Sequence, residues 1–229
     1  MHFGKRNPKH IYMMGNNLIN VTEEEKDLGI TITNNLNWRT QTAICVKKAN
    51  RIIGMIKHTF SHIDKEMFIS LYSTLVRPQL EYCPQVWSPY HMSDVKLLED
   101  VQRRATKMVP ELQHLSYNER LTSLKLYPLS DRRRRGDMIA TFKILNGFTD
   151  CNQQKLIPLC SNTNKATRSH NMQITQKIPR SGTRHNFYTN RIVLPWNQLS
   201  NHTIDSITIN EFKARYDREV LGDYLINTT

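Results

Sequence analysis

Between Trp38 and Gly147, apolar side chains recur at intervals of three and four residues, with proline or glycine at the interruptions. Side chains at that spacing share one face of a helix, so the pattern predicts a series of amphipathic α-helices. Each apolar face has to be buried against another element, which favours a helical bundle. Gly147 suits the left-handed residue that ends a helix. The predicted helices cover residues 38–60, 64–76, 93–109, a short segment opening at Ser116, and 130–147.

Local signals set the expected helix boundaries. Pro78 and Pro110 are expected to end the second and third helices, because the residue before a proline is disfavoured in the helical conformation. Ser93 and Ser130 are expected to cap the helices that follow them. Ser116-Tyr117-Asn118-Glu119 has the form of a capping box, in which serine and glutamate satisfy each other's backbone donors.

Different patterns flank this region. Residues 11–33 alternate in the manner of short strands around a Gly15-Asn16 turn. Residues 148–182 are rich in Asn, Thr, Ser and Gln and predict a polar, basic linker with a possible strand at 172–178. Two further helical segments, 187–199 and 210–221, close the chain.

The expected fold class is therefore mainly α. It combines a helical bundle with a small N-terminal β-hairpin or sheet and a mixed, loop-rich C-terminal part. The expected segments are a β-hairpin over 1–36, a helical domain over 37–147, the linker over 148–182 and a C-terminal helical segment over 183–229.

Composition and charge indicate the class of partner. A hydrophobic content of 38% can supply an ordinary core, while a net charge of +12 attracts polyanions through counterion release. Nucleic acid is thus the expected partner, RNA or DNA. We expect no membrane association, because no apolar run approaches about 20 residues and no lysine-rich amphipathic helix is present. The N-terminal residues lack the apolar core of a signal peptide. We therefore expect an intracellular protein, with nucleus and cytoplasm both open.

The positive charge is unevenly distributed. From Cys151 to Ile204 there is no Asp or Glu. We expect such a stretch to lack salt bridges and to contact phosphate instead. Its basic residues are Lys155, Lys165, Arg168, Lys177, Arg180, Arg184 and Arg191, of which the four arginines are candidate nucleic-acid-binding residues.

A second group of candidates opens the helix at 130–147, namely Arg132, Arg133, Arg134 and Arg135. The helix macrodipole disfavours cations in that position by about 0.3 to 1 kcal/mol each, so something should offset the cost. Consecutive helical residues point in different directions, so the four cannot all be buried. Two interpretations stay open: contact with phosphate, and internal ion pairs with acids such as Glu111 or Glu119.

The charges of the helix at 93–109 predict a different role. Lys96, Asp100 and Arg104 lie four residues apart, and so do Glu99, Arg103 and Lys107. Pairs at that spacing stabilise exposed helices by about 0.2 to 0.5 kcal/mol each. We therefore expect this surface to be largely self-paired.

No metal site is expected. The cysteines fit no C-x-x-C or zinc-finger spacing, and Cys151, Cys160 and His170 match no tetrahedral signature. Glycine-rich phosphate loops, H-E-x-x-H and G-x-S-x-G are also absent, so we expect no catalytic residue and no small-molecule substrate.

Several phrases of the sequence follow one another in a specific order. They include LYSTLVRPQLEYC at 71–83, VWSP at 86–89, QRRATKM at 102–108, RRRRGDMIATFKIL at 132–145, RIVLPWNQL at 191–199 and FKARYD at 212–217. In this order they resemble the reverse transcriptase of jockey-like non-long-terminal-repeat retrotransposons, in the region after the polymerase active site. The resemblance covers nearly the whole chain. Ser200 departs from it, because the family usually has proline there.

The resemblance implies a palm–thumb junction over residues 1–36 and a thumb-like domain over 37–147. It also implies upstream polymerase and endonuclease domains as partners of this region. The intact family enzyme would use Mg²⁺ held by two close aspartates, but this sequence contains no Asp-Asp pair. We therefore expect no cofactor in this chain, and no activity from the chain by itself.

The functional expectation is a non-catalytic C-terminal fragment of a retrotransposon RNA-directed DNA polymerase. It would bind the backbone of element RNA or primer-template through the two arginine groups, and unpaired bases could stack on Tyr188 and Trp196. A core position for Trp196 is the competing interpretation. Two alternatives for the whole chain remain open: a helical protein-interaction module, and a truncated element copy with no function.

Overall fold

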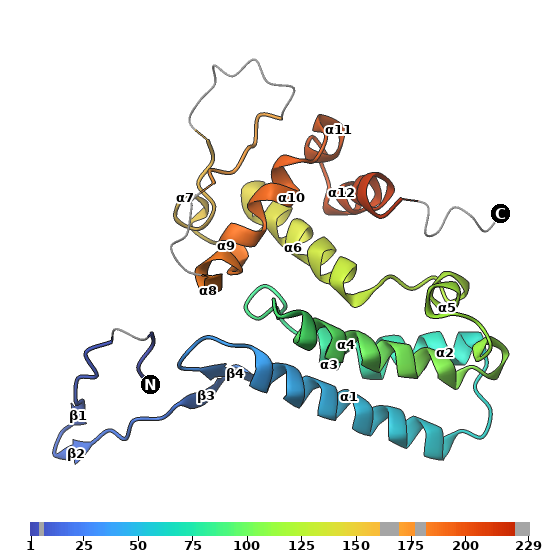
Figure 1. The fold of residues 1–229 in the computed structure, drawn as a ribbon. Coiled ribbons are helices and arrows are strands. Elements are labelled where there is room, and N and C mark those ends of the chain that lie inside the picture. Colours follow the sequence, from blue (N-terminus) through green and yellow to red (C-terminus); the bar gives the residue numbers. More distant parts are fainter. Residues whose placement is uncertain (5–6, 161–169, 177–181, 223–229) are drawn as a thin grey trace.

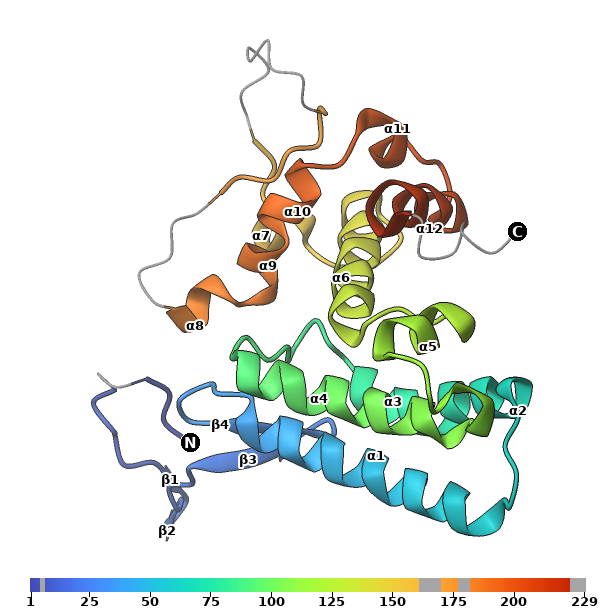
Figure 2. The same ribbon diagram turned by 45° about the vertical axis from the view of Figure 1, so that its right-hand side comes forward.

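The structure, a computed structural model, describes residues 1–4, 7–160, 170–176 and 182–222. It is mainly α-helical, as the sequence predicts, with two small antiparallel strand pairs near the N-terminus (Figure 1). A lower layer contains the helices from α1 (Arg39–Thr59) to α4 (Met92–Ala105). Above it lies α6 (Leu129–Leu145), with α9 (Tyr188–Arg191) and α10 (Val193–Asn197) on one side and α12 (Ile209–Tyr216) on the other (Figures 1 and 2).

The two strand pairs differ in burial. Strands β1 (Met13–Met14) and β2 (Asn17–Leu18) pair around the predicted turn and expose all their side chains. Strands β3 (Glu24–Asp27) and β4 (Ile30–Thr33) form the second pair, in which β3 is exposed and Ile30 is buried in the core. The Thr31 N–H donates to Gln41 Oε1 at 2.9 Å, which fastens β4 to the first helix.

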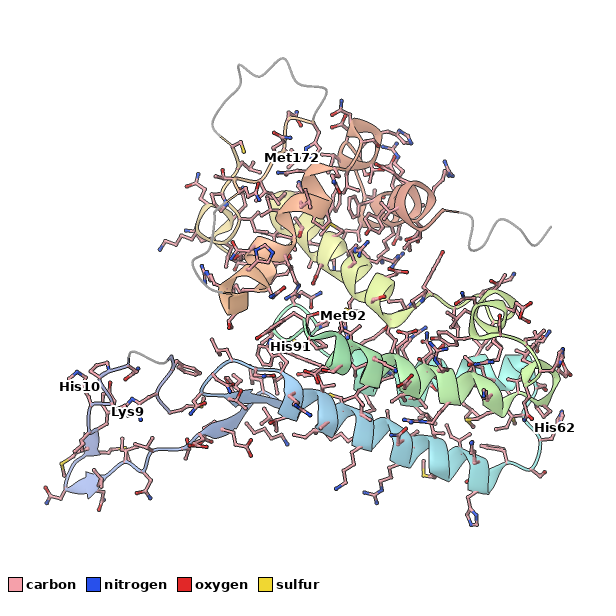
Figure 3. The ribbon with its side chains drawn as sticks, in the orientation of Figure 1. Lys9, His10, His62, His91, Met92 and Met172 are labelled. Atoms are coloured by element: carbon pink, nitrogen blue, oxygen red, sulfur yellow. The ribbon has the colours of Figure 1, made fainter. Side chains whose placement is uncertain are left out.

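The longest helix is α1 (Arg39–Thr59), and it packs against α4 (Met92–Ala105). Its buried residues include Ala49 and Ile53, while α4 contributes Leu98, Val101 and Ala105. Both alanines are fully buried, so small side chains lie within the packed interface. His62 marks the loop that joins α1 to the next helix, at the end of the layer far from the strands (Figure 3).

The predicted helix end at Pro78 is wrong. Helix α2 (Lys65–Leu71) passes into a π-helical turn (Tyr72–Val76) and then into α3 (Arg77–Glu81). Pro78 lies in the first turn of α3, where its missing N–H needs no partner. The Arg77 N–H donates to the Tyr72 carbonyl, five residues back, so the wider π turn carries the chain through the proline.

The expected serine caps are also wrong. Helix α4 begins at Met92 without a side-chain cap, which leaves Ser93 inside its first turn. Helix α6 (Leu129–Leu145) begins after Pro128, ahead of Ser130. Its first N–H is satisfied from another helix, because Leu129 N donates to Glu99 Oε2 at 2.9 Å.

Other boundaries are confirmed. Helical turns at Thr106–Met108 extend α4 and stop before Pro110, which opens a 3₁₀ turn at Pro110–Leu112. Helix α5 (Tyr117–Ser123) carries the capping box: Ser116 N donates to Glu119 Oε2 at 2.7 Å, and Glu119 N donates to Ser116 Oγ. Gly147, at φ +71°, follows α6 in the left-handed conformation.

The C-terminal part consists of short helices. They are α7 (Gln153–Leu156), α8 (Gly182–His185), α9 (Tyr188–Arg191), α10 (Val193–Asn197), α11 (Asn201–Ile204) and α12 (Ile209–Tyr216), which continues as a π turn (Asp217–Leu221). The possible strand at 172–178 is only a single bridge between Leu159 and Ile174 in the described part, and residues 177–178 lie outside it.

Two hydrophobic cores divide the buried residues. The first runs from Ile30 to Leu129 and contains Trp87, while the second runs from Met138 to Leu221 and contains Trp196. The division falls inside α6, so the buried apolar residues of its second half belong to the core that the C-terminal helices form. The predicted segment boundaries themselves stay a prediction.

Candidate nucleic-acid interface

Two of the four consecutive arginines of α6 are bound to carboxylates of other elements. Arg132 donates Nε and Nη2 to the two oxygens of Glu81, and Arg135 donates to the two oxygens of Asp217 at 2.5 and 2.8 Å. Burial would lower the pKa of Arg132, but the hydrogen-bonded Glu81 carboxylate outweighs it and raises that pKa. For Arg132 and Arg135, these bidentate pairs agree with the interpretation that the arginines form internal ion pairs.

The acids expected in that role are not the partners. Glu119 accepts the N–H of Ser116 in the capping box, and Glu111 is exposed in a 3₁₀ turn. The actual acceptors, Glu81 and Asp217, are 51 and 82 residues away along the chain from their arginines. Helical periodicity reports only neighbours three or four residues apart, so it could not identify them.

Arg133 is a buried cation that has no carboxylate partner within the described residues. Its side chain is 6% exposed, its Nη2 donates to the Leu80 carbonyl at 2.8 Å, and its guanidinium lies 5.2 Å from the Trp87 ring centre. Its Nε has no hydrogen-bond partner among the described residues. Burial lowers the pKa of Arg133 to about 10, so the group is still charged at neutral pH.

Arg134 is exposed, and within the described ranges it forms no hydrogen bond or ion pair. It lines, together with Arg133 and Arg191, a cleft of about 710 Å³ between α6, α10 and the π turn after α12. We call this the arginine cleft. The Tyr216 hydroxyl, which is buried and has no partner in the described structure, lines it as well.

Both acids of the arginine cleft are already engaged. Asp137 accepts hydrogen bonds from Arg191 at 2.8 and 3.0 Å. Glu219 accepts from the backbone N–H and the hydroxyl of Ser200 at 2.8 and 2.7 Å, and from the Thr203 hydroxyl. The lining thus carries three arginines and two acids, and within the described residues neither acid forms an ion pair with Arg133 or Arg134.

The arginines of the acid-free stretch have separate positions. Arg191 is an ion-paired residue, so the expectation that this stretch lacks salt bridges is wrong, because Asp137 reaches it from α6. Arg184 is exposed on α8, with its guanidinium 5.4 Å from the Phe187 ring. Arg168 and Arg180 lie outside the described residues. The structure therefore brings Arg133, Arg134 and Arg191 together, and places Arg184 apart from the arginine cleft.

The α4 charges pair less than expected. Asp100 and Arg103 lie 3.6 Å apart, but Arg104 donates to Asn50 on α1. The predicted pair of Glu99 and Arg103 is wrong. Glu99 instead accepts hydrogen bonds from the Tyr117 hydroxyl, Leu129 N and Gln102. The Glu99 carboxylate, expected on the surface, therefore binds the first residues of α5 and α6.

Neither aromatic residue proposed for base stacking is accessible. Trp196 is fully buried and donates Nε1 to the Met172 carbonyl at 2.9 Å, so the competing core interpretation is confirmed (Figure 3 labels Met172). Tyr188 is 9% exposed, its hydroxyl lies 3.1 Å from the Thr141 hydroxyl, and burial raises the pKa of Tyr188 to about 12. Base stacking on either ring would require opening the second core.

Sequence reasoning missed a different aromatic group. Phe3, Trp38, Tyr90 and Phe187 line one pocket of about 480 Å³. These residues come from segments far apart in the sequence and follow no common period, so no local pattern could have joined them. We call this the aromatic pocket.

The described residues contain no group of three or more His, Cys, Asp or Glu side chains that could hold a metal ion. In the described part of the chain, no helix has the length and apolar character needed to cross a bilayer. No protein-family model, curated protein or solved structure matches the chain.

Proposed function

We propose that the chain binds the phosphate backbone of RNA or DNA in the arginine cleft. The observation that carries the proposal is the pair formed by Arg133 and Arg134, two adjacent cations that line one cleft without a carboxylate partner among the described residues. Burying a cation without a counter-ion is costly, and a phosphate oxygen in the cleft would offset that cost.

The charge of the whole chain supports the same partner. A net charge of +12 attracts a polyanion over distances longer than any single contact. We further propose, from the order of its sequence phrases, that the chain is the non-catalytic C-terminal part of a jockey-like RNA-directed DNA polymerase. In that setting the arginine cleft would hold the backbone of element RNA or primer-template behind the catalytic domain.

The salt dependence of binding tests the proposal. A fluorescently labelled RNA hairpin is titrated with the chain by anisotropy at several salt concentrations. Each phosphate contact contributes about 0.9 to the slope of log K against log salt for a duplex. Arg134→Ala should therefore weaken binding at low salt and reduce the slope by about 1.

Arg51→Ala is the matched control, because Arg51 is exposed on α1 and does not line the arginine cleft. It should change affinity and slope much less than Arg134→Ala. Equal losses in the two variants would mean that binding is diffuse and does not use the cleft. Weak binding of the wild-type chain at low salt would rule out the proposal altogether.

A protein-interaction module is the second candidate, and one observation favours it. Met13 and Met14 on β1 and Leu18 on β2 are 60%, 73% and 60% exposed, which leaves this hairpin without a core of its own. Exposed apolar side chains of this kind mark contact sites in many proteins. A chain that fails to bind RNA at low salt would leave this candidate standing.

A further inference from the structure

The aromatic pocket differs from the arginine cleft because four aromatic side chains line it. Of its rings, Phe3 and Phe187 are 46% and 43% exposed, whereas Trp38 and Tyr90 are half-buried. Exposed rings keep apolar surface in contact with water, which is unfavourable. A flat apolar group bound in this pocket could stack on several rings and remove that surface from water. The pocket volume of about 480 Å³ lies within the usual range for a small-molecule group.

Four separate parts of the fold supply these rings, and Phe3 comes from the segment before β1. Trp38 precedes α1, Tyr90 belongs to the loop before α4, and Phe187 lies between α8 and α9. Figure 3 labels His91 and Met92, directly after Tyr90, at the end of α4 that lies nearest α8 and α9. The pocket is thus formed where the first core meets the C-terminal helices.

The charged side chains that line the pocket in the described structure are basic. They are Arg184 and Arg191, of which Arg191 is also paired with Asp137. Asn186 adds an amide whose Nδ2 donates to the Gly182 carbonyl at 2.8 Å. Its Oδ1 has no hydrogen-bond donor among the described residues and can accept one from an exocyclic amino group. A flat, aromatic group attached to a negative charge fits this set.

Arg191 connects the two sites, because it lines both the aromatic pocket and the arginine cleft. We propose that the aromatic pocket takes one unpaired base of a nucleic-acid strand, stacked on the rings of Trp38 and Phe187, while the backbone of that strand lies in the arginine cleft. This inference rests on the proposed function. A base paired within a duplex is already covered on both faces, so the pocket selects single-stranded segments.

Tryptophan fluorescence gives a direct readout. Trp87 and Trp196 are 0% exposed, whereas Trp38 lines the pocket and is half-buried. A single-stranded decamer of oligoadenylate should quench the emission of Trp38 on binding, because a stacked base quenches an indole. Inorganic polyphosphate of similar charge should bind the arginine cleft without this quenching. Trp38→Phe should remove the quenching, because the only indole that lines the pocket among the described residues is then absent.

Phe187→Ala tests the energetic contribution of the pocket. Loss of one stacked base should weaken oligoadenylate binding by about tenfold, with no change in the affinity for polyphosphate. Phe148→Ala is the matched control, because Phe148 is 50% exposed and does not line the pocket. It should leave both affinities unchanged, and circular dichroism should confirm that both variants are folded.

Two outcomes would overturn the inference. One is equal quenching of Trp38 by polyphosphate and by oligoadenylate, and the other is an unchanged affinity of Phe187→Ala for oligoadenylate. In either case, salt-dependent polyphosphate binding that is weakened by Arg134→Ala would leave the proposed function intact. If polyphosphate does not bind at low salt, the proposed function itself fails, and the inference fails with it.

Discussion

Arg191 donates hydrogen bonds from Nε and Nη2 to the two carboxylate oxygens of Asp137, at 2.8 and 3.0 Å. Its Nη2 also donates to the Pro84 carbonyl at 2.8 Å, so one guanidinium joins α9, α6 and the loop before α4. The Arg191 and Asp137 side chains are 18% and 8% exposed. The pair therefore stabilises the contact between the two halves of the molecule.

Arg191→Ala should lower the free energy of unfolding by about 3 kcal/mol, because it leaves the Asp137 carboxylate buried without its counter-ion. Burial already raises the pKa of Asp137, against the opposing effect of Arg191. Urea denaturation measures the change. The double variant with Asp137→Asn should recover part of the loss, because the buried charge is gone. A loss below about 1 kcal/mol for Arg191→Ala would show that the pair acts like an exposed salt bridge.

Arg133→Met should separate stability from binding. Methionine keeps apolar contact with Trp87 and removes a buried charge without an acid partner, although the Leu80 carbonyl loses its donor. We expect the free energy of unfolding to change by less than about 1.5 kcal/mol in either direction. Affinity for the RNA hairpin should fall by about tenfold or more, since a charge-assisted contact to phosphate is lost. Unchanged affinity would place the phosphate elsewhere.

The hydrogen bonds to Glu219 predict a pH dependence. Burial would raise the pKa of Glu219, but hydrogen bonds from Thr203 and Ser200 outweigh it and lower that pKa below its ordinary value. An acid with a lowered pKa in the folded state contributes stability that is present above its ordinary pKa of 4.5. That stability is lost as the pH falls through the lower, folded-state pKa.

Glu219→Gln should therefore cost about 1 kcal/mol at pH 7, and the difference from the wild type should shrink as the pH falls from about 5 to about 3. Thermal unfolding at several pH values measures it. Glu111→Gln is the control, because Glu111 is exposed. A constant difference across that range would mean that the loss of stability does not depend on the ionisation of Glu219.

The turn at Ser200 contains a hydrogen bond that a proline at this position could not make. The Ser200 hydroxyl caps α11, and its N–H donates to Glu219 at 2.8 Å. Proline has no N–H and could not make that bond. The turn therefore uses a backbone hydrogen bond to the π turn that follows α12, and any residue except proline could donate it.

Features determined by neighbouring residues were predictable from the sequence. The capping box at Ser116 and the helix end at Gly147 depend on residues within one turn, and both are confirmed. The predicted helix end at Pro78 is wrong because a π turn continues the helix there. The predicted cap by Ser130 is wrong because the distant Glu99 accepts the first N–H of α6. Tertiary contacts override such signals wherever a partner lies far along the chain.

The candidate site was predictable only in part. The electrostatic cost of placing Arg132 to Arg135 at a helix start predicted that they have anionic partners, and Arg132 and Arg135 have carboxylate partners. Arg132 and Arg135 form ion pairs, whereas Arg133 and Arg134 form none in the described structure. This difference depends on Glu81 and Asp217, which lie far away along the chain. Base-stacking residues were assigned to Tyr188 and Trp196 because aromatic type alone does not reveal burial.

Helix α6 carries a consequence for any shortened form of the protein. Leu129 at its start belongs to the first core, and Met138 and Phe142 belong to the second. A piece that retains either core has to retain this helix, and it would then present the unused half of the helix to water. Such pieces should self-associate through that apolar surface.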